Sequence, residues 1–123
     1  MPSSSTQTAP SATIPDRRAR VFVAEPNSRY NLEDAEKFGR VVYLDTRQEL
    51  SIFQTDEMLD AIFNRLTEME YDPDEDFFCL AGHMITVSLV LAALIARYDW
   101  VRTLMYDARA SVYVERIVHP RYE

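Results

Sequence analysis

Short apolar runs separated by polar turns make up most of this 123-residue chain. Runs of four apolar residues at 21–24, 41–44 and 77–80 predict three short strands. The third run is followed by a glycine and then by an almost wholly apolar stretch of helical length, 84–96. Two further strand-like runs, 101–106 and 111–118, are separated by a connection short enough for an antiparallel hairpin.

Helical spacing of apolar residues predicts two more helices. Residues 31–38 predict a short helix, with Asn31 as its N-cap and Gly39 in the left-handed position after its end. Residues 55–69 predict an amphipathic helix with Thr55 as N-cap. One stripe holds its apolar residues: Met58, Leu59, Ile62, Phe63, Leu66 and Met69. The run 84–96 is apolar on nearly every side, so we expect it to be the most buried helix.

The order of these elements, β-α-β-α-β-α-β-β, predicts the α/β class. We expect a single small domain, with a mixed, mostly parallel sheet, helices on its faces and a C-terminal β-hairpin. Residues 1–19 are rich in Ser, Thr and Pro and predict a flexible arm. The domain then spans 20–118, and 119–123 form a tail. Three arginines at the junction, Arg17, Arg18 and Arg20, suit either a solvated edge or a contact with an anion.

Charge and composition narrow the classes of function. The net charge of -7 argues against nonspecific binding of nucleic acid, which needs excess Lys and Arg. The only cysteine, Cys79, lies in a predicted buried strand and excludes an internal disulfide. No signal peptide is visible, and the longest apolar run is too short to span a bilayer. We therefore expect a soluble, intracellular protein that does not interact with membranes.

Candidate chemistry gathers where strands end. In open α/β sheets, ligands bind beyond the carboxyl ends of strands, close to helix N-termini. Three predicted strand ends carry polar groups: Glu25–Pro26–Asn27, Asp45–Thr46 and Gly82–His83. Gly82 would let an anion approach the first N–H groups of the following helix, and His83 could donate a proton there.

This predicts a ligand site formed by Asn27, Asp45, Gly82 and His83, with His83 as the catalytic residue if there is chemistry. The simpler alternative is a tight turn with a capping or solvated histidine. Glu25, Asp45 and His83 would form a metal site only if their strand ends converged, and we expect neither a metal nor another cofactor.

Four segments resemble a group of small uncharacterised phage and prophage proteins. They are KFGRVVYL (37–44), DEDFFCLAG (74–82), LVLAALIARY (89–98) and LMYDARASVYVERIV (104–118). In that group a glycine-led strand, an acidic strand ending in glycine, an Ala-rich helix and a hairpin follow in the same order. The resemblance implies a viral origin and no particular activity. The chain departs from the group at His83, where an acidic or small residue is common, and at Tyr106, where tryptophan is usual.

More remotely, the layout is similar to the archaeal-virus ring nucleases that counter type III CRISPR signalling. Those are small α/β homodimers that cleave cyclic tetra-adenylate without a metal, with a catalytic histidine in a Gly-His pair at a helix start. Gly82 and His83 would be the counterparts here, and VFVAEPNSRYNL (21–32) resembles their first strand and loop. Their catalytic segment after the last hairpin has no counterpart in this chain.

Two functions remain open from the sequence. The favoured one is a phage accessory protein that acts as a non-catalytic interaction module for a host or virion protein, because no complete catalytic set is visible. The alternative is a cyclic or linear nucleotide-binding protein, acting as a sponge or as a metal-independent nuclease. We also expect a homodimer formed through an open sheet edge, with Trp100, Tyr106 and Tyr113 at the interface. Either function places the protein in the host cytoplasm or in the virion.

Overall fold

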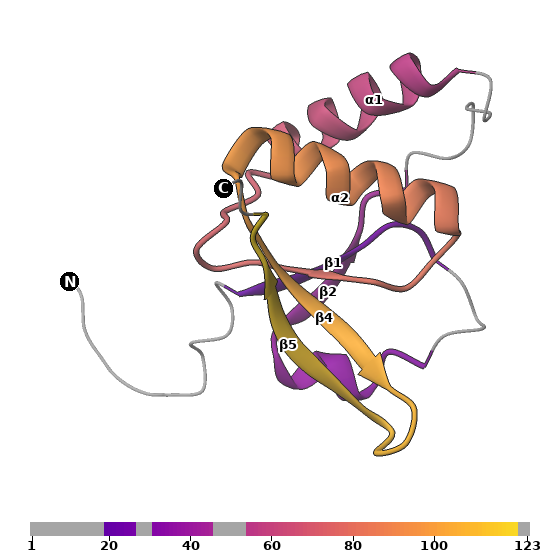
Figure 1. The fold of residues 1–123 in the computed structure, drawn as a ribbon, viewed down its shortest axis with the longest axis vertical. Helices are drawn as coiled ribbons and strands as arrows, with labels where there is room; N and C mark the ends of the chain where they lie inside the picture. The colour runs from indigo at the N-terminus through magenta and orange to yellow at the C-terminus, as the bar shows by residue number, and fades with distance from the viewer. Residues whose placement is uncertain (1–18, 27–30, 46–53, 121–123) are drawn as a thin grey trace.

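The computed structural model describes residues 19–26, 31–45 and 54–120. All of the predicted arm except residue 19, and most of the predicted tail, lie outside these ranges. The elements follow the predicted order (Figure 1). They are β1 (Arg20–Val23), the 3-10 helix η2 (Asp34–Lys37), β2 (Arg40–Tyr43), α1 (Thr55–Glu68), β3 (Phe77–Cys79), α2 (Met84–Tyr98), β4 (Val101–Asp107) and β5 (Val112–Val118). The predicted α/β class and the single small domain are confirmed.

One five-stranded sheet organises the domain, with strand order β2-β1-β3-β4-β5. The three pairs among β2, β1, β3 and β4 are parallel, and β4 with β5 is antiparallel. This is the predicted mixed, mostly parallel sheet with a C-terminal hairpin. The order also means that β1, β2 and β3, whose ends carry the candidate site residues, are neighbours at the centre and one side of the sheet.

The two faces of the sheet have different covers. Phe22 and Phe78 face the two long helices, where they pack with Ile62 and Leu66 of α1 and Leu94 of α2. Successive strand residues point to opposite faces, so the neighbours of Phe22 and Phe78 form a second cluster. That cluster contains Val21, Val23, Phe77, Cys79, Leu104 and Tyr113, with Ala35 of η2. The longer helices therefore lie on one face, and among the described helices the short η2 is the one that covers the other face (Figure 1).

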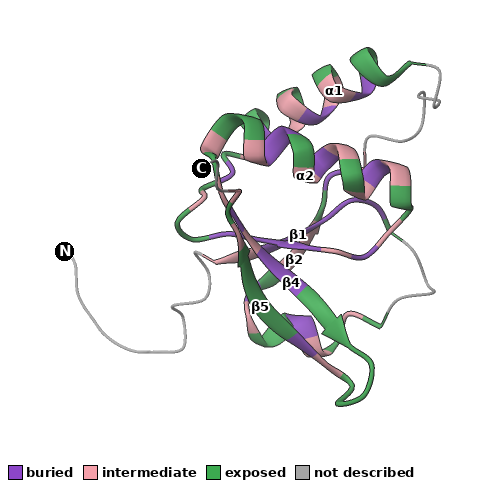
Figure 2. Cartoon of the chain, viewed as in Figure 1, coloured by how far each residue is buried: buried purple, intermediate pink, exposed green. Residues whose placement is uncertain are grey.

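The helix α2 is more buried than α1, yet it is not enclosed on all sides. It has four buried residues, Thr86, Val90, Ala93 and Leu94, against three in α1. Its outer side is exposed, most of all at Met84, whose exposed fraction is 76% (Figure 2). The prediction that this is the more buried of the two long helices is confirmed, while its outer side, which includes Ala92, is exposed.

Three local predictions need correction. Residues 31–38 form only one 3-10 turn, in which Asn31 Oδ1 accepts the N–H of Glu33 at 2.9 Å instead of capping a longer helix. Gly39 is not left-handed, but a Cβ there would lie 2.6 Å from the carbonyl oxygen of Ala19. The N-cap of α1 is Gln54 rather than Thr55, and its side chain makes no capping hydrogen bond.

Candidate functional site

The carboxyl ends of β1, β2 and β3 meet at one edge of the sheet. The N–H of Asp45, after β2, donates to the carbonyl of Ala24, after β1, at 2.8 Å. On the other side of β1, a Cβ added to Gly82 would lie 3.4 Å from the Cβ of Ala24. Three of the predicted segments are thus brought together, whereas Asn27 lies outside the described residues.

Glu25 is the most unusual group at this edge. Its exposed fraction is 7%, and its Oε1 has no hydrogen-bond partner among the described residues. A buried carboxylate oxygen without a partner is costly. Asp45 follows β2 in the left-handed conformation, with φ 51°. Within the described ranges, no three His, Cys, Asp or Glu residues are arranged to hold a metal ion, so Glu25, Asp45 and His83 do not form the metal set considered above.

The backbone conformation at residue 82 requires a glycine. Its φ of 138° is accessible mainly to glycine. The direction a side chain would take is filled by protein, because a Cβ would lie 3.3 Å from Cγ2 of Val87. Gly82 therefore allows the end of β3 to pack closely against α2. The sequence alone predicts a glycine here equally well for close packing and for the approach of a ligand.

His83 is the N-cap of α2. Its Nδ1 accepts the N–H of Ile85 at 3.3 Å, and its carbonyl accepts the N–H of Val87 at 2.9 Å. An accepting Nδ1 places the single proton of the neutral ring on Nε2. The side chain remains exposed. This geometry is the capped turn considered as the simpler alternative, and ligand binding at Gly82 and His83 stays a prediction.

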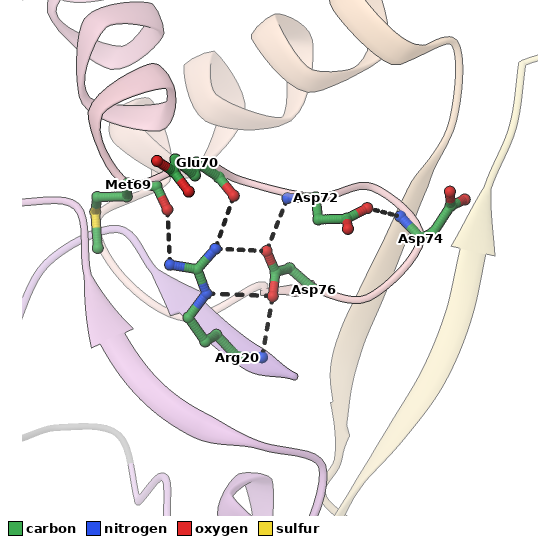
Figure 3. A network of polar contacts seen from close by, with 6 residues as sticks. All are labelled: Arg20, Met69, Glu70, Asp72, Asp74 and Asp76. Atoms are coloured by element: carbon green, nitrogen blue, oxygen red, sulfur yellow. Dashed lines mark hydrogen bonds and ion pairs between the residues drawn. The ribbon is translucent and has the colours of Figure 1, made fainter. Parts of the chain in front are cut away.

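A second polar cluster lies at the opposite ends of β1 and β3 (Figure 3). The carboxylate of Asp76 is buried and accepts four hydrogen bonds: from the main-chain N–H, Nε and Nη2 of Arg20, and from the N–H of Asp72. The guanidinium also donates to the carbonyls of Met69 at 2.7 Å and Glu70 at 2.8 Å. Of the two alternatives for the arginine cluster, Arg20 therefore takes the contact with an anion, and that anion is a carboxylate of its own chain. Arg17 and Arg18 lie outside the described residues.

The hairpin of β4 and β5 carries most of the exposed large apolar side chains. Met105 and Val114 are a directly opposed pair on the face of the sheet that packs against the helices, and Tyr106 lies on the other face. The exposed fraction is 36% for Met105, 38% for Val114 and 50% for Tyr106. We call these three residues the hairpin tip. The ribbon extends there past the two long helices, α1 and α2 (Figures 1 and 2). On the other face η2 lies beside the hairpin and contacts Tyr113, while Tyr106 stays exposed.

Of the three aromatic residues expected at a homodimer interface, Trp100, Tyr106 and Tyr113, only Tyr106 is exposed. Tyr113 is buried, and its hydroxyl donates to the carbonyl of Asn31 at 3.2 Å. Trp100 is half-buried. Met105 and Val114 were missed by the sequence analysis. The alternation of side chains along the strands predicts which face of the sheet Met105 and Val114 lie on. Only the three-dimensional arrangement shows that α1 and α2 do not reach far enough to cover them.

The family comparison covers both the strand ends and the hairpin. A family model described as phage Pam3 gp32-like protein matches residues 14–120.

The chain belongs to this phage protein family.

Membership in the Pam3 gp32-like family confirms the resemblance to small phage proteins. It gives no support to the resemblance to archaeal-virus ring nucleases. No curated protein and no solved structure matches the chain. Among the described residues, no helix is both long enough and apolar enough to cross a membrane.

Proposed function

We propose that this phage protein is an accessory protein that acts as a non-catalytic interaction module, and that the hairpin tip docks into another protein, either of the host or of the virion. The observation that carries the proposal is the exposure of Met105, Tyr106 and Val114 on a ribbon that projects beyond the two long helices, α1 and α2. In this proposal the protein acts in the host cytoplasm or as part of the virion.

The ribbon is well suited to present these side chains rigidly. β4 and β5 pair over seven residues each. Oγ1 of Thr103 donates to the carbonyl of Arg116 at 2.6 Å, and the N–H of Tyr113 donates to Asp34 Oδ2 at 2.6 Å. A preorganised surface loses little conformational entropy on binding, which favours affinity. Tyr106 also stacks near Tyr113, with 5.0 Å between ring centroids, so its ring is held in place.

The side chains of the hairpin tip indicate the chemistry of the partner. Exposed tyrosine and methionine are enriched at protein interfaces, where tyrosine fills a pocket and keeps its hydroxyl hydrated. The charges nearby have both signs, since Asp107, Arg109, Glu115 and Arg116 are all exposed. We expect a partner with an apolar pocket and a mixed polar rim rather than a strongly charged surface.

The strand-end geometry supports this proposal over the nucleotide alternative. His83 Nδ1 is engaged in a helix cap, and Gly82 packs against Val87 and Ala24. Glu25 and Asp45 add two carboxyl groups to the same edge, where they would repel a phosphate. The nucleotide alternative stays a prediction; calorimetry with cyclic and linear oligoadenylates tests it directly.

A site-specific photo-crosslinker tests the proposal. The photoreactive phenylalanine analogue benzoylphenylalanine replaces Tyr106 in one variant and Met84 in a matched control, because Met84 is also apolar and exposed but lies on α2. During infection we expect a crosslinked product of one defined mass from position 106 and none from position 84. A Val114→Glu substitution in the same protein should remove that product. Equal products from both positions, or none from position 106, would contradict the proposal.

A further inference from the structure

The strand β5 forms one open edge of the sheet, because it is last in the strand order. The carbonyl of Leu104 accepts the N–H of Leu80 in β3, so the polar groups of Leu104 point away from β5. Leu104 is opposite Glu115 in the antiparallel pair. Along a strand of such a pair, residues whose N–H and C=O groups point toward the partner strand alternate with residues whose N–H and C=O groups point away from it. The N–H and C=O groups of Tyr113, Glu115 and Ile117 therefore point outward.

One end of this edge is covered by the chain itself. Asp34 Oδ2 accepts the N–H of Tyr113, and Asn31 accepts its hydroxyl. No described residue takes the outward N–H groups of Glu115 or Ile117. Ile117 has an exposed fraction of 59%, the highest of any large apolar residue in the sheet. The open part of the edge thus runs from Glu115 toward His119 and contains an exposed isoleucine.

We propose that a second copy of this chain occupies the open edge, with the two β5 strands antiparallel and related by a two-fold axis at Ile117. The sheets of the two copies would then be continuous. The surface is separate from the hairpin tip, so the inference does not depend on the proposed function. A monomeric protein could still dock through Met105, Tyr106 and Val114.

The charges along β5 disfavour two neighbouring registers. An axis at Glu115 would place two glutamates opposite each other, and an axis at Arg116 would do the same with two arginines, which is unfavourable. Both registers would also require the N–H of Tyr113, which Asp34 already holds. An axis at Ile117 instead pairs Ile117 with itself.

The same register is favourable for the neighbouring residues. Glu115 lies opposite His119 of the second copy, without a like charge. Arg116 lies opposite Val118, without a like charge. Pro120 lies opposite Val114, in a position where the antiparallel ladder needs no N–H. In this register a second copy places no like charges opposite each other and leaves the N–H of Tyr113 to Asp34.

Disulfide crosslinking tests the register. In the proposed dimer the two Ile117 Cα atoms would be about 5.5 Å apart, as in a hydrogen-bonded antiparallel pair, and that distance suits a disulfide. Ile117→Cys should therefore form a covalent dimer on mild oxidation. Val118→Cys is the matched control, because Val118 would lie opposite Arg116 and should crosslink poorly. The native Cys79 is buried, and the wild-type protein controls for it.

The mass in solution tests the dimer itself. Light scattering at micromolar concentration should give twice the chain mass of 14.3 kDa for the wild type. Ile117→Lys should give the monomer mass with an unchanged circular dichroism spectrum, because the side chain is exposed in the single chain and two lysines would face each other in the dimer. A wild-type monomer, a dimer that survives Ile117→Lys, or stronger crosslinking by Val118→Cys would each overturn the inference.

Discussion

Arg20 and Asp76 connect the start of β1 to the turn before β3 through three hydrogen bonds, from the main-chain N–H at 3.1 Å, Nε at 3.4 Å and Nη2 at 2.9 Å. Fifty-six positions separate the two residues in the sequence. The same guanidinium holds the carbonyls that follow α1. One ion pair thus fixes β1, β3 and the end of α1 relative to one another.

Asp76→Ala should therefore destabilise the domain strongly. It leaves a guanidinium whose side chain is 18% exposed without its carboxylate partner, and breaking a buried pair costs about 3–5 kcal/mol. Glu68→Ala is the matched control, since Glu68 is exposed and pairs with Arg65 at 3.3 Å, an arrangement worth at most about 0.5 kcal/mol. Urea unfolding measures both. Similar midpoints for the two variants would show that the cluster contributes little.

Asp34 makes the stability depend on pH. The N–H of Tyr113 stabilises its carboxylate and lowers the pKa of Asp34 below its ordinary value, and Lys37 adds to this effect. Because the folded pKa is the lower one, the stabilisation is present above the unfolded pKa of about 3.9 and is lost as the pH falls through the folded pKa. The difference in urea midpoint between wild type and Asp34→Asn should be largest near pH 6 and should decrease as the pH falls below about 4. A constant difference over that range would contradict this account.

Tyr71 is buried together with its hydroxyl group. Its hydroxyl has no hydrogen-bond partner among the described residues, while its ring packs edge-on against Phe22. Burial raises the pKa of Tyr71, so the hydroxyl is neutral at pH 7. Tyr71→Phe should stabilise the domain by about 1 kcal/mol by removing an unpaired polar atom. Tyr113→Phe, which loses a hydrogen bond, should destabilise it by a similar amount; thermal melts of both variants show whether the signs differ.

The element order was predictable because each strand and helix carries a local signal. The apolar runs at 77–80 and 84–96 and the connection at 107–110 led directly to β3, α2 and the hairpin. The contact between Arg20 and Asp76 carries no such signal, because it depends on the end of α1 approaching β1. The prediction for Gly39 was wrong for a related reason. Gly39 has no side chain, which makes room for the backbone of Ala19, the residue before β1.

The candidate site was predictable only in part. The strand-end rule brought Asp45 and Gly82 to the same edge, since β1, β2 and β3 are neighbours in the sheet. The rule does not say whether His83 faces a ligand or caps its helix, because both fit a histidine at a helix start. The hairpin tip was not predictable, since the length of α2 relative to β4 decides which strand residues are covered.

The growth of phage that carry variants of this gene tests the central claim most directly, namely that the protein works by binding through its hairpin tip and not by catalysis at His83. His83→Asn keeps a side chain that can cap α2 but cannot serve as a general acid. The double substitution Met105→Ser and Tyr106→Ser changes only exposed side chains. In growth competition against wild-type phage, we predict that His83→Asn is neutral and that the double variant is outcompeted. A growth defect in His83→Asn with a neutral double variant would contradict the account.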